Sequence, residues 1–394
     1  MRSYVDALET LYALVRVGEK YSLDGPRGFS KRLGDPLSSY DSILVGGTNG
    51  KGSTSHILAK LLESGGSRIG LFTSPHIVSY RERIKVNGIA ISEEDVCELV
   101  ERVVPIAARE GFSFFETTWA MAALYFKEQE VDTVVWEVGL GGRLDATNVC
   151  DPIGSIVTNI GFDHMAILGD TLSAIAREKA GIFRSGRPAL TADREARELL
   201  QASTDAHVEC VPTDSTLSHS LKGAHQQRNV SVAVRLLTML ERPFELNALM
   251  ELSIPGRLER VGNLILDCAH NPHAVETVLG ALNALLLDDA RPLEIVFGAM
   301  ADKDVQGMAN AISSVRLPVH LVEPSYPRRI DLRALQSHFR ADGVASLGTP
   351  ASFLATRRDD RQYLVLGSAF LVAEFKALIA SVEYPECGIV TLAR

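Results

Sequence analysis

The sequence lacks the features typical of secreted, membrane-spanning and nucleic-acid-binding proteins. Its five cysteines are scattered and none forms a CxxC pair, so neither a disulfide framework nor a structural zinc site is expected. No apolar run reaches the roughly 18 residues of a transmembrane helix. Acidic residues exceed basic ones by 49 to 40, which excludes general attraction to DNA or an anionic membrane. We therefore expect a cytoplasmic protein, and by default a monomer, because no segment encodes an interface.

Short apolar runs alternate with helix-like stretches along the 394 residues, 46% of which are hydrophobic. Continuous apolar strands separated by helices are typical of parallel sheets covered on both faces. Two series of such runs predict two α/β domains, which we place at 1–255 and 256–394 because Pro255-Gly256 interrupts the pattern. The polar segment 201–220 is expected to be loop or edge strand. The predicted strands lie at 42–47, 69–74, 133–139, 153–161, 264–270, 293–300, 319–324 and 363–368.

The segment GGTNGKGST (46–54) follows the first apolar run and precedes a helical pattern. Glycines let backbone N–H groups turn toward an anion, and a helix N-terminus adds a favourable dipole. The match to the nucleotide-binding pattern GxxxxGK[ST] is imperfect, because Gly52 separates Lys51 from Ser53. The segment predicts a phosphate-binding loop in which Lys51 reaches the outer phosphates.

Polar side chains end several other apolar runs, and ligands of α/β sheets bind at such strand ends. Glu137 ends a run that we expect to be buried, where a carboxylate needs a cation. That cation is either a metal ion or an arginine such as Arg143. The local sequence around His164 favours a structural histidine held by hydrogen bonds. The local sequence around Ser74 favours an ordinary serine in a turn.

Ten motifs in order resemble the folylpolyglutamate synthase / dihydrofolate synthase family of the Mur-ligase superfamily. They extend from residue 47 to residue 370, nearly the whole chain. The motifs are GTNGKGS (47–53), TSPH…RERIKVNG (73–88), FFETTWAMAALYF (114–126), EVGLGGRLDATN (137–148), DH…LGDTLSAIAREKAGIF (163–183), KGAHQQRN (222–229), PGRLE (255–259), DCAHNP (267–272), ADKD (301–304) and GSAF (367–370).

The resemblance implies a P-loop, Mur-ligase-like ATPase domain with a mostly parallel sheet, followed by a smaller Rossmann-like domain. It implies an ATP-dependent amide ligase that converts a pterin carboxylate to an acyl phosphate, which the amine of L-glutamate then attacks. The implied substrates are ATP, L-glutamate and either dihydropteroate or a reduced folate, with Mg²⁺ as cofactor, expected as two ions.

The resemblance also assigns roles to individual residues. It implies ATP contacts by Asn49, Gly50, Lys51, Gly52, Ser53, Asn229, Arg257 and Asp267, and Mg²⁺ ligation by Ser74, Glu137 and His164. It implies pterin contacts by Phe115, Glu116, Thr117, Thr118, Leu144, Asp145 and Ala146. His270 and Ser368 correspond to positions on the glutamate side.

Lys179 has two interpretations. The surrounding sequence favours an ordinary lysine on the solvent-exposed face of a helix. The resemblance instead implies carbamylation by CO₂, which would turn the cation into an anion that holds a second Mg²⁺ or orients the phosphates. Together with Lys51, His164 and His270, it completes the predicted catalytic set.

Competing functions share parts of this pattern. A single-activity folylpolyglutamate synthase is the alternative within the family, although the FETT stretch (115–118) resembles bifunctional enzymes more. A peptidoglycan-type Mur ligase needs a further domain before the phosphate loop, and about 45 residues cannot form one. A phosphotransferase that acts on a hydroxyl group would need neither the PGRLE motif (255–259) between the two predicted domains nor a second α/β domain. A binding module without catalysis would be expected to lack Lys51, Glu137 or His164.

Overall fold

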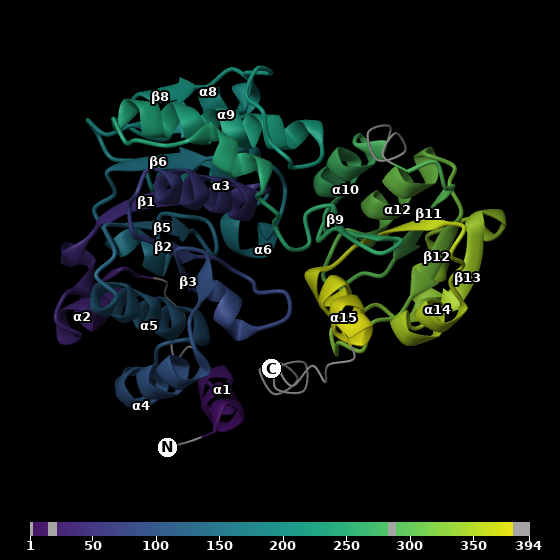
Figure 1. Ribbon diagram of the computed structural model, residues 1–394, viewed down its shortest axis with the longest axis horizontal. Helices are drawn as coiled ribbons and strands as arrows, with labels where there is room; N and C mark the ends of the chain where they lie inside the picture. Colours follow the sequence, from purple (N-terminus) through teal and green to yellow (C-terminus); the bar gives the residue numbers. More distant parts are fainter. Residues whose placement is uncertain (1–2, 15–21, 283–288, 381–394) are drawn as a thin grey trace. The chain divides into compact units, whose positions relative to one another are not determined.

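The computed structural model describes residues 3–14, 22–282 and 289–380, and these form two α/β units. The first unit holds the described residues up to 220 together with 226–252. The second holds 221–225 and the described residues from 253 onward. Figure 1 shows a central sheet with helices around it in each unit.

The sheet of the first unit has the strand order β4-β3-β2-β5-β1-β6-β7-β8. Its strands run parallel except β3 and β4, which form an antiparallel extension of β2. The central register pairs Val45 with Glu137 and Gly46 with Val157, so the carboxyl ends of β1, β5 and β6 meet at one edge. The strands are β1 (Asp41–Gly46), β2 (Ile69–Phe72), β3 (Ile84–Val86), β4 (Ile89–Ala90), β5 (Thr133–Glu137), β6 (Gly154–Val157), β7 (Ala189–Thr191) and β8 (Val208–Cys210).

Helices cover this sheet on both faces, with α3 and α5 on opposite sides of the strands (Figure 1). The chain moves from β1 to β2 through α3 and back to β5 through α5, and right-handed crossovers in opposite directions place their helices on opposite faces. The helices are α1 (Tyr4–Tyr12), α2 (Asp24–Arg32), α3 (Lys51–Ser64), α4 (Glu93–Glu110), α5 (Phe114–Glu128), α6 (Met165–Leu168), α7 (Leu172–Ala180), α8 (Arg194–Gln201) and α9 (Ala224–Met239).

The sheet of the second unit has the order β13-β12-β11-β14-β10-β9, and only β9 runs antiparallel to its neighbour. Its strands are β9 (Glu259–Val261), β10 (Leu264–Leu266), β11 (Leu293–Phe297), β12 (Val319–Val322), β13 (Val344–Gly348) and β14 (Gln362–Leu366). The helices are α10 (Pro272–Leu279), α12 (Val305–Ser314), α13 (Leu332–Ser337), α14 (Pro350–Thr356) and α15 (Ala369–Ala380).

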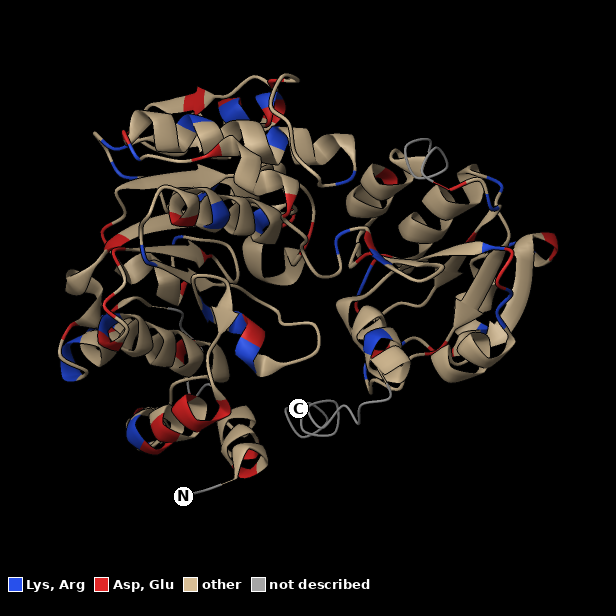
Figure 2. Cartoon of the chain, viewed as in Figure 1, with Lys and Arg blue, Asp and Glu red and all other residues tan. Residues whose placement is uncertain are grey.

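The predicted fold class is confirmed: both units are α/β with mostly parallel sheets, and each predicted apolar run contains a strand. The segment 201–220 contains edge strand β8, as expected. Strands β3, β4, β7, β9 and β13 were not predicted. The first four have only two or three residues each, and β13 has no buried residue. Lys, Arg, Asp and Glu lie mainly on helices and loops, whereas most strands are uncharged (Figure 2). No helix in the described ranges is long and apolar enough to span a bilayer.

Candidate active site

The predicted phosphate loop connects β1 to α3 at the carboxyl edge of the first sheet. Gly50 precedes α3 with φ +85°, a conformation that favours glycine. The segment that leaves β6 supports the loop. The Asn49 amide donates to the Asn159 side chain at 2.9 Å, and the Thr158 hydroxyl donates to the Asn49 carbonyl at 2.6 Å. The loop is therefore held by its neighbouring strand directly before the N-terminus of α3, where the helix dipole favours an anion.

Two lysine ammonium groups lie at the carbonyl oxygen of Gly47. Lys51 Nζ donates to it at 3.0 Å and Lys179 Nζ, from α7, donates to it at 2.9 Å. Lys179 is only 4% exposed, so its interpretation as a solvated helix lysine is wrong. Burial, followed by the charge of Lys51, lowers the pKa of Lys179 to about 7. A buried amine with that pKa spends much of its time neutral and nucleophilic at physiological pH.

Glu137 ends β5 and is 4% exposed, as expected for a carboxylate at the end of a buried strand. Its Oε2 accepts the Ser74 amide at 3.0 Å, and its carboxylate oxygens lie 3.5 Å from the position of a Cβ on Gly52. Arg143 instead pairs with Glu178 at 2.8 Å, so the alternative of a Glu137–Arg143 ion pair is wrong. A buried carboxylate beside a phosphate loop is the kind of hard oxygen ligand that Mg²⁺ prefers.

His164 is the third predicted metal ligand, and it precedes α6 with φ +51°. Its side chain is 47% exposed, and its Nε2 lies 3.9 Å from Asp163 Oδ1. The Thr48 hydroxyl ties the preceding turn to the phosphate loop, because it accepts the Gly161 amide at 2.9 Å. The structure therefore connects the His164 segment to the loop through Thr48, whereas Ser74 and Glu137 contact each other directly.

Asn229 on α9 also reaches the phosphate loop. Its Oδ1 lies 3.1 Å from the position of a Cβ on Gly50, and its Nδ2 donates to Gln226 Oε1 at 3.0 Å. Gln226 in turn lies 3.3 Å from the hydroxyl of Ser53. Gln226 was not singled out from the sequence, although it lies within the KGAHQQRN motif. Together Gln226 and Asn229 fix the first turn of α3.

The residues predicted to contact the pterin fall into two groups. Phe115 packs closely on Gly139, where a Cβ would lie 2.4 Å from the ring and 3.2 Å from Asp145 Oδ2. Asp145 accepts the amides of Leu140 and Thr147 at 2.9 and 3.0 Å, and burial raises its pKa. The second group is buried and bonded to its own helix end: Glu116 accepts from Ser113, Thr117 donates to Ser113, and Thr118 donates to Phe114. Leu144 and Ala146 flank Asp145.

The remaining predicted residues belong to the second unit. Asp267 is 4% exposed and accepts the amides of Leu258 and Ala269, both at 2.9 Å. Its pKa is raised by burial, and the charge of Arg257 opposes that rise. His270 Nδ1 lies 2.9 Å from the Cys268 carbonyl. The Gly367 amide donates to Ala269 at 2.8 Å, so Ser368 adjoins the His270 segment at the carboxyl edge of this sheet.

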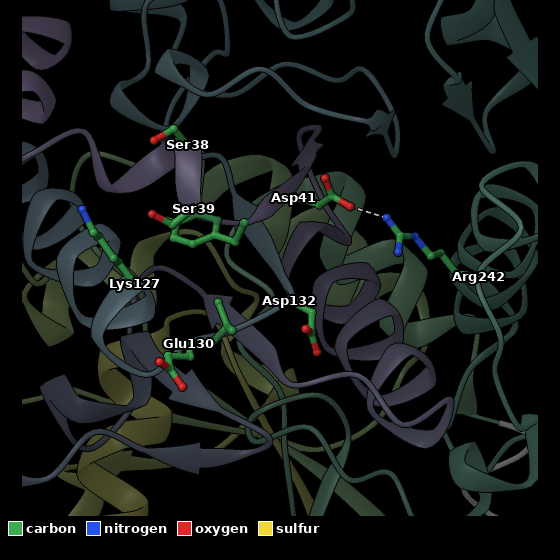
Figure 3. A pocket seen from close by; sticks show the side chains of 9 residues that line it. Ser38, Ser39, Asp41, Lys127, Glu130, Asp132 and Arg242 are labelled. Carbon is green, nitrogen blue, oxygen red and sulfur yellow. Dashed lines mark hydrogen bonds and ion pairs between the residues drawn. The ribbon is translucent and has the colours of Figure 1, made fainter.

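A polar hollow of about 810 Å³ lies elsewhere in the first unit (Figure 3). Asp41 and Asp132 mark the amino ends of β1 and β5 there, and Asp41 pairs with Arg242. Ser38, Ser39, Lys127 and Glu130 also line it. Because β1 and β5 are parallel, this hollow is at the opposite sheet edge from Gly46 and Glu137. It contains none of the predicted site residues.

Comparison with known families matches both halves of the chain. A family model described as the Mur ligase middle domain matches residues 45–266. A second, described as the Mur ligase, glutamate ligase domain, matches residues 256–368. The first match alone spans more than half of the chain.

Individual relatives are similar over most of the chain. An Escherichia coli dihydrofolate synthase/folylpolyglutamate synthase is 32% identical, and the match covers 96% of this chain and 95% of the relative. A probable bifunctional folylpolyglutamate synthase/dihydropteroate synthase from Haloferax volcanii is 34% identical over 94% of this chain. The chain spans only 50% of that relative's length.

A solved structure shares the fold. The bifunctional folylpolyglutamate synthase/dihydrofolate synthase of Yersinia pestis, complexed with AMPPNP and a Mn ion, superposes with a TM-score of 0.85. It is 27% identical, and the match covers 96% of this chain and 98% of that one.

Proposed function

Because the chain belongs to the dihydrofolate synthase/folylpolyglutamate synthase family of Mur ligases, we propose that it joins L-glutamate to a pterin carboxylate with the hydrolysis of ATP. The observation that carries this proposal is the phosphate loop with Lys51 and Lys179 at Gly47 and the Glu137 carboxylate beside Gly52. That arrangement gathers lysine side chains and a buried carboxylate at one helix N-terminus, which supports the binding of a nucleotide with a metal ion.

The first step activates the pterin carboxylate, which is a poor electrophile at neutral pH. A carboxylate oxygen forms a bond to the γ-phosphorus of ATP, the bond to the bridging oxygen breaks, and ADP leaves. Lys51 and the first amides of α3 neutralise charge on the phosphates. Asn229 and Gln226 hold the first turn of that helix in place. The chain's contribution here is positioning and electrostatic stabilisation.

The second step forms the amide. The amine nitrogen of L-glutamate bonds to the acyl carbon, inorganic phosphate leaves with the former carboxylate oxygen, and the nitrogen loses a proton. We propose that His270 and Ser368 of the second unit hold the amino acid. The hydrogen bond between Gly367 and Ala269 brings their two segments together at the carboxyl edge of the sheet, which supports this assignment. We propose that Asp267 and Arg257 of the same unit contact ATP.

A divalent metal fits the residues at Glu137. The carboxylate is buried beside the Ser74 amide, and a buried carboxylate of this kind is stabilised by a cation. We propose that Glu137, Ser74 and His164 hold Mg²⁺, which would neutralise charge on the ATP phosphates. The Yersinia pestis relative was solved with a Mn ion and AMPPNP, which supports a divalent metal and a nucleotide here.

We further propose that Lys179 is carbamylated. Its amine nitrogen bonds to the carbon of CO₂ and one proton leaves to water, which gives an anionic carbamate. The low pKa of the amine makes the neutral nucleophile abundant, and the charge of Lys51 would stabilise the product. The carbamate would offer two oxygen ligands to a second Mg²⁺.

The other residues of the site have proposed roles as well. Asn49, Gly50, Lys51, Gly52 and Ser53 would surround the phosphates. Phe115, Leu144, Asp145 and Ala146 would contact the pterin. Glu116, Thr117 and Thr118 would shape that site from inside α5, in keeping with their helix-internal hydrogen bonds. We also propose the domain bounds 1–255 and 256–394, a monomeric state and a cytoplasmic location.

One assay tests the function and separates its two forms. ATP turnover is measured with dihydropteroate and then with tetrahydrofolate, each with and without L-glutamate. Glutamate-dependent turnover with both acceptors identifies the bifunctional enzyme, and turnover with tetrahydrofolate alone identifies a folylpolyglutamate synthase. If neither dihydropteroate nor tetrahydrofolate supports ATP turnover, the proposal is contradicted.

A further inference from the structure

The segment that follows β12 presents an arginine without an acidic partner. Arg328 is exposed, and within the described ranges no Asp or Glu lies within 4.0 Å of its guanidinium. Its neighbour Arg329, by contrast, pairs with Glu323 at 2.7 Å. An arginine fork without a carboxylate can bind one supplied by a ligand in bidentate geometry.

Backbone contacts fix the position of Arg328. The Arg329 amide donates to the Tyr326 carbonyl at 3.1 Å, which closes a four-residue turn with Pro327 at its second position. The Ala301 amide donates to the Arg328 carbonyl at 2.9 Å, and the Ile330 amide to Ala299 at 3.1 Å. The turn is therefore attached to the segment that leaves β11.

An aromatic stack connects this turn to the GSAF motif. The rings of Tyr326 and Phe370 are stacked, with centroids 3.9 Å apart and planes 12° apart. The guanidinium carbon of Arg328 lies 5.5 Å from the Tyr326 ring centroid, in a cation–π contact. The Phe370 amide donates to the Ser368 hydroxyl at 3.1 Å. Ser368 and Arg328 thus sit at opposite ends of a short rigid chain of contacts.

The proposed binding site for L-glutamate needs a positive charge such as that of the Arg328 guanidinium. L-Glutamate carries two carboxylates, whereas the two residues assigned to it, His270 and Ser368, carry no permanent charge. Arg328 follows β12 and Ser368 follows β14, and both strands run parallel to β11, so both residues lie at the carboxyl edge of the same sheet. A fixed cation at that edge would offset the negative charge of the amino acid.

We propose that Arg328 binds a carboxylate of the incoming amino acid and sets the preference for an acidic substrate. Tyr326 and Phe370 are positioning residues that hold the guanidinium. This inference rests on the proposed ligase function. It adds a substrate-binding residue outside the ten motifs, in the segment SYPRRID (325–331).

The test compares Arg328→Gln with wild type at saturating ATP and pterin while L-glutamate is varied. Loss of a bidentate charged contact should raise the KM for glutamate about 10- to 100-fold. The KM for ATP should stay within about twofold, and the preference for glutamate over glutamine should fall with the affinity for glutamate. Arg340→Gln is the matched control, because Arg340 is an exposed arginine of the same unit that lies beside Asp342.

Further variants test the positioning role. Phe370→Leu and Tyr326→Leu should raise the KM for glutamate while kcat changes little. Tyr326→Phe keeps the ring, so its KM for glutamate should stay near the wild-type value. Thermal melts verify that each variant is folded. An unchanged KM for glutamate in Arg328→Gln, or a raised KM for ATP instead, would overturn the inference. A wild-type protein with no glutamate-dependent turnover would overturn the proposed function and, with it, this assignment.

Discussion

Lys51 and Lys179 donate to one and the same oxygen, the carbonyl of Gly47, at 3.0 and 2.9 Å. Two ammonium groups on one carbonyl repel each other, and the burial of Lys179 adds to the cost of its charge. An anion would relieve that repulsion. The nucleotide phosphates and a carbamate on Lys179 are the two anions that the proposed chemistry supplies at this point.

The first prediction concerns stability and pH. The pKa of Lys179 is lowered from 10.5 to about 7, so the unfolded chain binds a proton between those values that the folded chain has released. The free energy of unfolding should therefore rise with pH in this window, by up to about 1.4 kcal/mol per pH unit. Below it both states are protonated, and the folded state bears the full cost of the buried charge.

Lys179→Met removes that cost. In CO₂-free buffer the variant should be more stable than wild type at about pH 6, and the difference should shrink as the pH rises toward about 9. Urea unfolding across this range measures it. A difference that is independent of pH would show that the ammonium is not strained in the folded protein.

A second prediction concerns Glu137. Glu137→Gln keeps the size of the side chain and removes the carboxylate beside Ser74 and Gly52. ATP turnover should fall about 100-fold or more, because charge stabilisation at the phosphates is lost. Mn²⁺ binding in the presence of ATP, followed by electron paramagnetic resonance, should weaken in parallel.

Glu178→Gln is the control for that substitution, since Glu178 pairs with the half-exposed Arg143. It should retain turnover and Mn²⁺ binding. Equal losses in the two variants would argue that a general change of charge, and not metal ligation by Glu137, is responsible.

Gly47 is the subject of a third prediction. It has φ +138°, and a Cβ there would lie 1.9 Å from the hydroxyl oxygen of Thr158. Gly47→Ala should therefore lower the free energy of unfolding by about 2–4 kcal/mol and weaken ATP binding. Gly66→Ala is the matched control, because Gly66 has φ +92° with nothing within 4 Å of its Cβ position.

The Gly66 variant should show backbone strain alone, about 1 kcal/mol, with ATP binding unchanged. Urea unfolding and nucleotide titration of both variants give the two readouts. If Gly47→Ala bound ATP as tightly as wild type, the contact between the loop and Thr158 would not be required for phosphate binding.

The sequence predicted the fold well, because buried parallel strands are continuous apolar runs that end in glycine or polar residues. Strand ends such as Gly46 and Glu137 could be located for the same reason. Short strands such as β3 and β4 could not, since two or three residues carry no clear period. The burial of Lys179 was inaccessible to local pattern, because it depends on packing against a loop 132 positions away.

The same limit applies to partners in three dimensions. Arg143 is near Glu137 in sequence, yet it pairs with Glu178, and Gln226 reaches Ser53 from a distant helix. Arg328 was not singled out from the sequence, because an arginine without an acidic partner is identified only when its surroundings are known.

The last prediction concerns CO₂. If Lys179 is carbamylated, wild-type activity should fall in CO₂-depleted buffer and return when bicarbonate is added, since carbamate formation is reversible. Lys179→Ala should lose about 100-fold or more of the activity and gain nothing from bicarbonate. Carbon-13 NMR of the protein equilibrated with labelled bicarbonate should give a carbamate signal that the variant lacks.

Lys60→Ala is the control for this substitution, because Lys60 on α3 is a partly exposed lysine that pairs with Glu63 at 3.4 Å. It should keep both its activity and the labelled signal, which distinguishes a modified Lys179 from general loss of positive charge near the phosphate loop. Full activity in Lys179→Ala would contradict any role for the modified side chain. A carbamate signal that persists in Lys179→Ala would place the modification on another amine.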